Sequence, residues 1–286
     1  SATLALCLAV PLAGSEPEAR YAASSMMRRL AAWSLLVAVT LSLAACTSSD
    51  SATPSPAARD ARASDAPAEA GNAADMPVAE PRPRIYRIVT IGDVYTSGEG
   101  TESPRSDGWP GQMVASLTQH GDMRIAWRDL AEKSSPSVEV IDTQLAQVGD
   151  YEPDVVTLQV GVDDIVAGET ESYTENVAHI LDELLLVLPA ERIFAITTPD
   201  HTLTRWGEAY GSSEVVAALN AELEKVASAR DITVIDIGPV NERVAVDSSL
   251  LVQQVPPRPY PTAKQYAAWA ELIGPYVRSA LESIEP

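Results

Sequence analysis

Histidine, phenylalanine and cysteine are scarce in this chain of 286 residues, which contains three, one and two of them. Both cysteines, Cys7 and Cys46, lie within the first 46 residues. The rest of the chain therefore folds without a disulfide or a thiolate metal site, and a disulfide scaffold is excluded. No histidine follows His201 and no aspartate follows Asp247, so the C-terminal segment holds no Asp-x-x-His pair.

Basic residues are also few, since 20 Lys and Arg stand against 40 Asp and Glu. The formal charge of −20 argues against sequence-independent binding to nucleic acid or to an anionic lipid surface, because such partners are repelled before contact. We expect no nucleic-acid partner and no cofactor. Residues 85–286 carry 13 basic and 32 acidic side chains, so most of the acidity belongs to that part of the chain.

The N-terminal region has the order of a secretory signal. Residues 26–29 are Met-Met-Arg-Arg, and the apolar run 30–45 after them is shorter than the roughly 20 residues that a membrane-spanning helix needs. The run ends in Leu-Ala-Ala-Cys46, which resembles the lipobox of bacterial lipoproteins. The resemblance implies that Cys46 is lipidated and attaches the protein to a membrane.

Two further expectations follow from this resemblance. Thr47, rather than aspartate, follows the cysteine, which by the lipoprotein rule implies sorting to the outer membrane of a bacterial envelope, with the protein facing the periplasm or the surface. Residues 1–25 precede a complete signal at 26–46, and we interpret them as an extension upstream of the true start.

Residues 47–84 are rich in Ala, Pro, Ser and Asp and contain no aromatic residue. Such a segment buries too little apolar surface to offset its ordering entropy, so we expect a disordered tether. A flexible chain of this length has an end-to-end distance of roughly 35 Å. The domain organisation is therefore an upstream extension, a signal, a tether and one folded domain at 85–286.

The folded domain alternates short β-branched runs with helical periodicity, which predicts a three-layer α/β/α sandwich with a mostly parallel five-stranded sheet. A capping box, Ser172-Tyr-Thr-Glu175, opens the first of three predicted helices. In such a sheet ligands bind beyond the carboxyl ends of the strands. The predicted strands are 85–91, 123–127, 154–160, 192–197 and 232–237, and the predicted helices are 172–188, 212–229 and 262–281.

Four segments of this domain carry a resemblance to a known family. The segment 88–100, Ile-Val-Thr-Ile-Gly-Asp-Val-Tyr-Thr-Ser-Gly-Glu-Gly, is similar to the first block of the SGNH or GDSL-type esterases and lipases. Residues 156–165 resemble the third block, 260–269 resemble the last, and Thr-Pro-Asp at 198–200 follows the fourth predicted strand. The resemblance implies the SGNH hydrolase fold, which is flavodoxin-like.

The catalytic positions of that family are occupied by other residues. The family's nucleophile is the serine of Gly-Asp-Ser, where this chain has Val94, and an isopropyl group offers no nucleophilic atom. Alignment on Pro261 puts Tyr260 at the histidine and Pro257 at the aspartate that orients it. Alignment from Asp247 shifts the register by about three residues and puts Pro257 at the histidine and Gln254 at the aspartate. Neither alignment supplies a base.

The family's oxyanion hole is altered as well. The resemblance implies donors from the nucleophile's backbone N–H, from a glycine N–H and from the asparagine amide of Gly-x-Asn-Asp. Ser134 takes the glycine position, and Gly161-Val-Asp163-Asp164 replaces the asparagine with aspartate. An ionised aspartate donates no hydrogen bond and adds negative charge where negative charge would develop. We therefore expect no catalytic residues of the usual kind.

Other residues of the expected cleft are Asp93, Thr96, Ser97, Gly161, Asp164, Asp200 and His201. Ser97 and His201 form a conceivable substitute dyad, although a hydroxyl in a turn more often bonds its own backbone. Asp93, Asp163, Asp164 and Asp200 follow strand ends and would converge. Converging carboxylates share protons or bind a hard cation such as Ca²⁺ or Mg²⁺, for which Asp93, Asp163 and Asp164 are weak candidates.

The sequence thus predicts a lipid-anchored SGNH-type protein that binds or scaffolds and does not hydrolyse, with an unidentified small-molecule, acyl or glycan ligand in its cleft. Two alternatives stay open at this point. One is an active esterase, lipase or acyl-transfer enzyme that uses non-standard residues, and the other is a divalent-cation-binding domain. A cleft filled by Tyr260 or its neighbours favours scaffolding, whereas an open acidic cleft favours a cation or a polar ligand.

Overall fold

The computed structural model describes residues 84–119, 123–203, 207–253 and 259–284. The expected extension, signal, lipidated Cys46 and tether lie outside the described residues, as do Gln254 and Pro257. Within the described residues no helix is long and apolar enough to span a bilayer.

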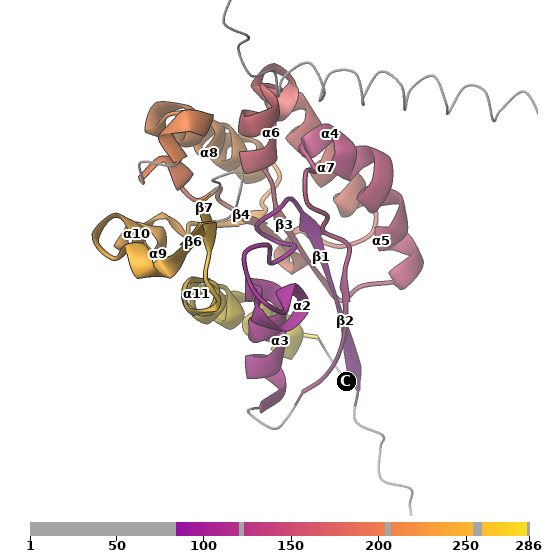
Figure 1. Ribbon diagram of the computed structural model, residues 1–286. Coiled ribbons are helices and arrows are strands. Elements are labelled where there is room, and N and C mark those ends of the chain that lie inside the picture. Colours follow the sequence, from indigo (N-terminus) through magenta and orange to yellow (C-terminus); the bar gives the residue numbers. More distant parts are fainter. Residues whose placement is uncertain (1–83, 120–122, 204–206, 254–258, 285–286) are drawn as a thin grey trace, which may run out of the picture. The chain divides into compact units, whose positions relative to one another are not determined.

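Five parallel strands form the central sheet, in the order β2-β1-β3-β4-β5 (Figure 1). The predicted three-layer α/β fold and its five-stranded sheet are confirmed, and each predicted strand coincides with an observed one to within two residues. The bounds are β1 Ile85–Gly92, β2 Arg124–Asp129, β3 Val155–Gln159, β4 Ile193–Ile196 and β5 Thr233–Ile235.

The three inner strands are apolar runs because helices cover both of their faces. Along β1, Ile88 packs into one core cluster, whereas Val89 and Ile91 pack into the other. All five residues of β3 and all four of β4 are buried. Because these strands lie inside the sheet, their residues are buried without a break and do not alternate between buried and exposed.

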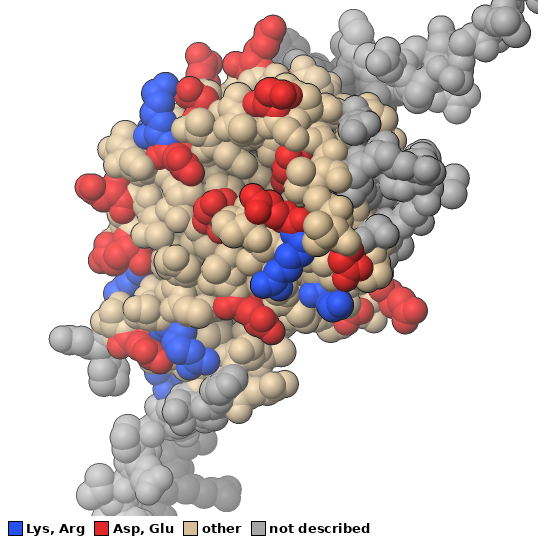
Figure 2. Space-filling view, turned by 90° about the vertical axis from the view of Figure 1, so that its left-hand side faces the viewer, with Lys and Arg blue, Asp and Glu red and all other residues tan. Residues whose placement is uncertain are grey.

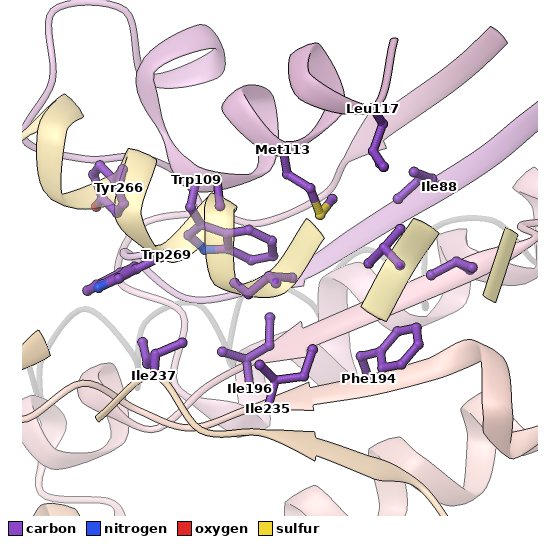
Figure 3. Packing of buried hydrophobic residues seen from close by; sticks show 14 of the residues in the cluster. Ile88, Trp109, Met113, Leu117, Phe194, Ile196, Ile235, Ile237, Tyr266 and Trp269 are labelled. Atoms are coloured by element: carbon purple, nitrogen blue, oxygen red, sulfur yellow. The ribbon is translucent and has the colours of Figure 1, made fainter. Parts of the chain in front are cut away.

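On one face of the sheet, α3 (Trp109–Gln119) and α11 (Ala263–Glu282) bury their apolar stripes together. Figure 3 shows Met113 and Trp109 of α3 beside Trp269 of α11, above Ile196 and Ile235 of the strands. The predicted stripe of α11 is confirmed, since Tyr266, Trp269, Ile273 and Val277 are all fully buried.

The opposite face is covered by α5 (Leu145–Tyr151), α7 (Tyr173–Leu185) and α8 (Ser213–Ser228). Their buried leucines, isoleucines and valines pack on the other side chains of β1, β3 and β4. The two clusters make the sheet the middle layer of three. Shorter helices join these elements: α2 Pro104–Asp107, α4 Ser137–Glu139, α6 Val162–Ala167, α9 Gly238–Asn241 and α10 Arg243–Val246.

A second, two-stranded antiparallel sheet pairs β6 (Leu251–Gln253) with β7 (Pro259–Pro261). The sequence did not predict it, because three-residue strands that contain proline carry almost no periodic signal. This pairing places Tyr260 in the middle of β7, opposite Val252.

Two of the long helices are capped by side chains for which no cap was predicted, and the one predicted cap is absent. Ser212 and Thr262 cap α8 and α11 by accepting the backbone N–H of Val215 and Gln265. The capping box at Ser172 is wrong, because the Ser172 side chain makes no such bond and instead donates to the Glu169 carbonyl. A 3-10 turn over Thr170–Ser172 leads directly into α7, so Ser172 is already in helical conformation and the geometry of a cap is lost.

Charged side chains are spread over the surface of the domain. Figure 2 shows acidic side chains distributed across the face in view, with fewer Lys and Arg between them. Several of the basic groups are paired, as in Arg84 with Asp154, Arg87 with Glu152 and Arg230 with Asp182. The excess of acid noted in the sequence therefore lies on the folded domain.

Candidate functional site

The residues expected to form the site follow the carboxyl ends of β1, β3 and β4. Gly92 of β1 pairs with Gln159 of β3, and Gln159 pairs with Ile196 of β4. Because the three parallel strands are in register, the loops after them begin at the same edge of the sheet. The sequence therefore located this edge correctly.

The end of β1 is fixed by a buried glutamine that the sequence analysis missed. The carboxamide of Gln144 accepts the N–H of Gly92 and donates to its carbonyl, both at 2.9 Å. Gln144 ends a π-helical turn, Val140–Gln144, and this local widening is of a kind often found near functional sites. Gly92 has φ +151°, and a Cβ there would lie 2.2 Å from the Gln159 carbonyl oxygen.

A second buried glutamine, Gln159, joins the three strand ends. Its Oε1 accepts hydrogen bonds from the Trp109 indole at 3.0 Å and from the Thr96 hydroxyl at 3.3 Å. Its Nε2 donates to the Thr197 carbonyl at 3.3 Å. Thr96 is thus a buried structural residue, and Gln159 is recognisable in the sequence only as a polar residue inside an apolar strand.

Asp93 organises the loops after β1 and β3. Its Oδ1 accepts the N–H of Tyr95 at 3.1 Å and its Oδ2 accepts the N–H of Val162 at 3.2 Å. The side chain is 1% exposed. Burial raises the pKa of Asp93 well above the ordinary value, and the nearby Asp163 carboxylate raises it further.

Asp163 bridges the two backbone amides that face the end of β1. Its Oδ2 accepts the N–H of Val94 at 3.2 Å and the N–H of Ser135 at 3.0 Å, and the residue is 3% exposed. The second amide that Asp163 binds is that of Ser135, the residue after Ser134, which the family resemblance puts at the glycine position. Ser134 has φ +61°, a left-handed conformation that directs the following N–H, that of Ser135, toward the site.

Asp164 binds Ser137, the first residue of α4. Both of its carboxylate oxygens accept the N–H of Ser137, at 3.0 and 3.1 Å, and the Ser137 hydroxyl also donates to it. Burial raises the pKa of Asp164 to about 6, while the bonds from Ser137 lower it. Asn176 completes the arrangement by donating to the Ser137 hydroxyl.

The four aspartates do not form a single carboxylate cluster. Asp200 accepts hydrogen bonds from the backbone N–H and hydroxyl of Thr202 and from the Ser213 hydroxyl. Asp93, Asp163 and Asp164 each accept loop amides instead. Over the described ranges, no three His, Cys, Asp or Glu side chains are grouped so as to hold a metal ion.

Gly161 supports the loop that carries Asp163. Its φ is +136°, and a Cβ there would lie 2.3 Å from the Thr198 hydroxyl. That hydroxyl donates to the Val160 carbonyl at 2.7 Å, and the buried Tyr173 hydroxyl donates to the same carbonyl at 3.2 Å. The glycine is needed both for its backbone conformation and for the close approach of Thr198.

A small cleft lies above Val94. It is lined by Val94, Tyr95, Val162, Asp163, Val166, His201, Tyr210 and Tyr260, and its volume is about 20 Å³, which is room for one or two water molecules. Val94 is 4% exposed and Tyr260 8%. The structure thus brings Val94, Asp163, His201 and Tyr260 together around this cleft.

Ser97 and His201 are committed to other contacts. The Ser97 hydroxyl donates to the Val94 carbonyl at 2.9 Å, as expected for a hydroxyl in a turn. His201 lies in a 3-10 turn beside Tyr210, whose carbonyl is 3.4 Å from Nε2. Burial lowers the pKa of His201, so the neutral imidazole is favoured.

A five-stranded parallel sheet between two layers of helices, with the candidate site at the carboxyl ends of its strands, is the α/β fold of the SGNH hydrolases. The model of the GDSL-like Lipase/Acylhydrolase family matches residues 90–268. The chain belongs to that family.

Solved structures of esterases share the fold. A lipase/acylhydrolase from Enterococcus faecalis superposes with a TM-score of 0.55 at 17% identity, over 68% of this chain and 96% of that one. A family 3 carbohydrate esterase from Clostridium thermocellum gives 0.54 at 14% identity, over 70% and 98%. The acetylxylan esterase Axe2 from Geobacillus stearothermophilus gives 0.54 at 14%, over 70% and 95%.

One curated relative matches at the level of sequence. A multidomain esterase from Ruminococcus flavefaciens is 29% identical over 135 residues, which is 46% of this chain and 17% of the relative. This chain thus spans less than a fifth of the length of that relative.

Proposed function

We propose that this protein is a lipid-anchored member of the family that does not hydrolyse esters and serves as a scaffolding or binding module of the cell envelope. The observation that carries the proposal is the contact of Asp163 with the backbone N–H groups of Val94 and Ser135. The family resemblance puts two donors of the oxyanion hole at the backbone N–H groups of Val94 and Ser134, and Ser135 directly follows Ser134.

A carboxylate on these amides opposes acyl transfer in two ways. The tetrahedral intermediate needs donors aimed at its developing negative oxygen, and loss of one donor costs roughly 3 to 4 kcal/mol in barrier height. Here both amides already bind Oδ2 of Asp163. An oxyanion placed beside that carboxylate would also be repelled by it in a site shielded from water.

The positions of the nucleophile and the base support the same conclusion. The side chain next to these amides is the isopropyl group of Val94, which has no atom able to attack a carbonyl. Tyr260, at the expected place of the histidine, is nine-tenths buried and packs on Gly100, where an added Cβ would lie 2.3 Å from the Tyr260 Cβ. A phenol does not act as a general base at neutral pH.

The size of the cleft favours scaffolding over binding of an acyl or glycan ligand. A volume of about 20 Å³ admits one or two water molecules, whereas typical small-molecule sites are clefts of roughly 300 to 1,000 Å³. The aspartates support a divalent cation even less, because Asp93, Asp163 and Asp164 each already accept hydrogen bonds from backbone N–H groups.

The rival proposal is an esterase that uses Ser97 and His201, and the esterase relatives keep it open. A fluorophosphonate probe and p-nitrophenyl acetate applied to the full chain separate the two proposals. We expect no labelling and no turnover above that of the heat-denatured chain. Robust labelling that disappears in Ser97→Ala, but persists in the matched variant Ser106→Ala, would establish the esterase.

Attachment to the membrane is tested separately. Cells that express the full chain and receive an alkyne analogue of palmitate should incorporate it into the protein, and Cys46→Ser should abolish incorporation while Cys7→Ser retains it. Fractionation should place the wild-type protein in the outer membrane. Equal incorporation in Cys46→Ser would overturn the lipid anchor without bearing on the absence of hydrolysis.

A further inference from the structure

Exposed apolar side chains gather at one end of the folded domain. Among the described residues, five large apolar side chains are exposed: Ile85, Leu186, Val187, Val246 and Tyr276. All except Val246 belong to segments at the amino-terminal ends of the strands, which is the end of the sheet opposite the cleft. Leu186 is 79% exposed and Ile85 50%. Apolar area that stays outside the core in this way marks an interaction surface.

The position of these side chains follows from the chain topology. Ile85 is the first residue of β1. Leu186 and Val187 follow α7 and precede β4. Tyr276, in the second half of α11, contacts Phe194, the second residue of β4, with ring centroids 6.4 Å apart. All four exposed side chains therefore lie near the start of β1 or of β4.

α5 and β1 connect Val187 with Ile85. A Cβ on Gly149, in α5, would lie 3.9 Å from Cγ2 of Val187. The Gly149 carbonyl accepts the N–H of Glu152, whose carboxylate is 2.7 Å from the Arg87 guanidinium. Arg87 and Ile85 are two residues apart on β1, so their side chains point to the same side of the sheet. Val187 and Ile85 thus border one continuous stretch of surface.

Two arginines at the same end have no acidic partner. Arg124 begins β2 and is the register partner of Ile85, and Arg192 directly precedes β4. Neither forms an ion pair with a carboxylate in the ranges that the structure describes. The planar guanidinium group matches the geometry of a phosphate. Exposed apolar side chains beside such arginines are typical of surfaces that rest on lipid headgroups.

The chain enters the domain at this end. Ile85 directly follows the segment 47–84, which we expect to be a tether with an end-to-end distance of roughly 35 Å from the lipidated Cys46. A tether of that reach holds the domain near the bilayer at an effective concentration on the order of millimolar. A weak contact is therefore enough to keep the domain on the bilayer, and the amino-terminal end of the sheet is the part that the tether brings there.

We propose that the amino-end surface of the domain rests on the phospholipid bilayer. Its apolar side chains lie at the boundary between headgroups and acyl chains, and its two arginines bind the phosphates. The proposal rests on the lipid anchor proposed above, and it directs the cleft away from the membrane. The amino-end surface is formed by Ile85, Arg124, Leu186, Val187, Arg192 and Tyr276.

The acidity of the domain does not oppose this contact. At physiological ionic strength charges are screened beyond about 8 Å, so the acidic side chains at the cleft end do not act on the bilayer. Two acidic side chains near the amino-end surface, Asp154 and Glu152, are paired with Arg84 and Arg87. The excess of acid argues against binding by charge alone, whereas a tethered surface with exposed apolar side chains does not depend on net charge.

The lipidated full chain in vesicles tests the proposal. Vesicles of phosphatidylethanolamine and phosphatidylglycerol are prepared with and without a lipid that carries a nitroxide quencher near its headgroup. Leu186→Cys in a Cys7→Ser background gives a single free thiol once Cys46 is lipidated, and that thiol is labelled with an environment-sensitive dye. Val246→Cys is the matched control, because Val246 is 88% exposed on α10, on the far side of the domain from the start of β1 (Figure 1).

We expect the quencher to act several-fold more strongly on the dye at position 186 than on the dye at position 246. Equal, weak quenching at both positions, in protein that carries the lipid and floats with the vesicles, would overturn the proposal and leave the anchor in place. A blue-shifted but unquenched dye at position 186 would also overturn it, in favour of a second copy of the chain on this surface. A full chain that neither carries the lipid by mass nor floats would overturn the anchor, and the membrane contact with it.

The arginines are tested in the same vesicles. Arg124→Gln combined with Arg192→Gln should reduce quenching at position 186 several-fold. Arg243→Gln combined with Lys264→Gln, which removes two charges at the cleft end, should leave it unchanged. Circular dichroism checks that each variant is folded. Unchanged quenching in the first pair, or an equal reduction in both pairs, would overturn the contact of the arginines with phosphate.

Discussion

Oδ2 of Asp163 lies 3.2 Å from the backbone nitrogen of Val94, so a side chain of the protein occupies the amide that an SGNH esterase would offer to its substrate. The same oxygen accepts the N–H of Ser135. The backbone amides of two loops thus bind one carboxylate of the protein itself.

We propose that the protein does not hydrolyse esters, and on that proposal this arrangement predicts which substitutions would raise its reactivity. Val94→Ser alone should stay unreactive toward a fluorophosphonate, because both amides remain bound to Asp163. Val94→Ser with Asp163→Asn should react faster than Val94→Ser by a factor of roughly 10², the effect of one oxyanion donor. Labelling rates measure the difference, and equal rates for the two variants would show that Asp163 does not control the amides.

Asp129 should make stability fall as pH rises through the weakly acidic range. Burial raises its pKa to about 6, against the bond from Thr90 and the charge of Arg105, which lower it. The folded state then binds more protons than the unfolded state between pH about 4 and 6, so the free energy of unfolding falls by up to about 3 kcal/mol across that range. The penalty is absent below pH 4 and complete above pH 6.

Urea unfolding from pH 4 to 7 tests this sign. Asp129→Asn keeps an oxygen that can accept the hydroxyl of Thr90 but does not titrate, so the slope between pH 4 and 6 should be shallower than that of the wild type. The exposed Asp142→Asn is the matched control and should keep the wild-type slope. An unchanged slope in Asp129→Asn would contradict the raised pKa.

Gln144 should be among the most sensitive polar positions of the domain. Gln144→Leu leaves the N–H and carbonyl of Gly92 buried without partners, so we expect a loss of roughly 2 to 5 kcal/mol in the free energy of unfolding. Gln147→Leu, one turn further on at a partly exposed position, should cost less than about 1 kcal/mol. Chemical denaturation compares them, and similar losses would show that the contacts of Gln144 are not special.

Alanine substitutions at two glycines with positive φ distinguish the cost of backbone strain from the cost of crowding by an added Cβ. At Gly168, with φ +71°, an added Cβ meets no atom within 4 Å, whereas at Gly161 it would lie 2.3 Å from the Thr198 hydroxyl. Gly168→Ala should therefore cost only the left-handed strain, about 1 to 2 kcal/mol. Gly161→Ala should cost distinctly more and should displace Asp163, which thermal unfolding of both variants can show.

The main elements of the fold were predictable because their signals are local. β3 and β4 are bounded β-branched runs, and α11 carries a regular apolar stripe, so burial on both faces of a sheet was expected and observed. The capping box at Ser172 failed because a 3-10 turn, which has no distinct sequence pattern, precedes α7. The sheet of β6 and β7 escaped prediction because three-residue strands are too short to show a period.

The site was predictable in its members but not in its contacts. Val94, Asp163, His201 and Tyr260 line one cleft, as their places after the strands and in the family blocks indicated. Gln144 and Gln159 were missed, since a glutamine inside an apolar segment gives no sign of which backbone it will bond. The second amide belongs to Ser135 because of the left-handed conformation of Ser134, a dihedral angle that the residue type does not reveal.

The sequence by itself determined which atoms this protein can bring to chemistry: a valine instead of a serine after β1, an aspartate instead of an asparagine after β3, and no histidine after position 201. Only the tertiary structure decided where the new carboxylate goes. Asp163 lies far from Val94 and Ser135 along the chain, and the hydrogen bonds that join them depend on the register of parallel strands and on loop conformations. That is why the aspartate at position 163 was visible in the sequence, whereas its hydrogen bonds to both amides were not.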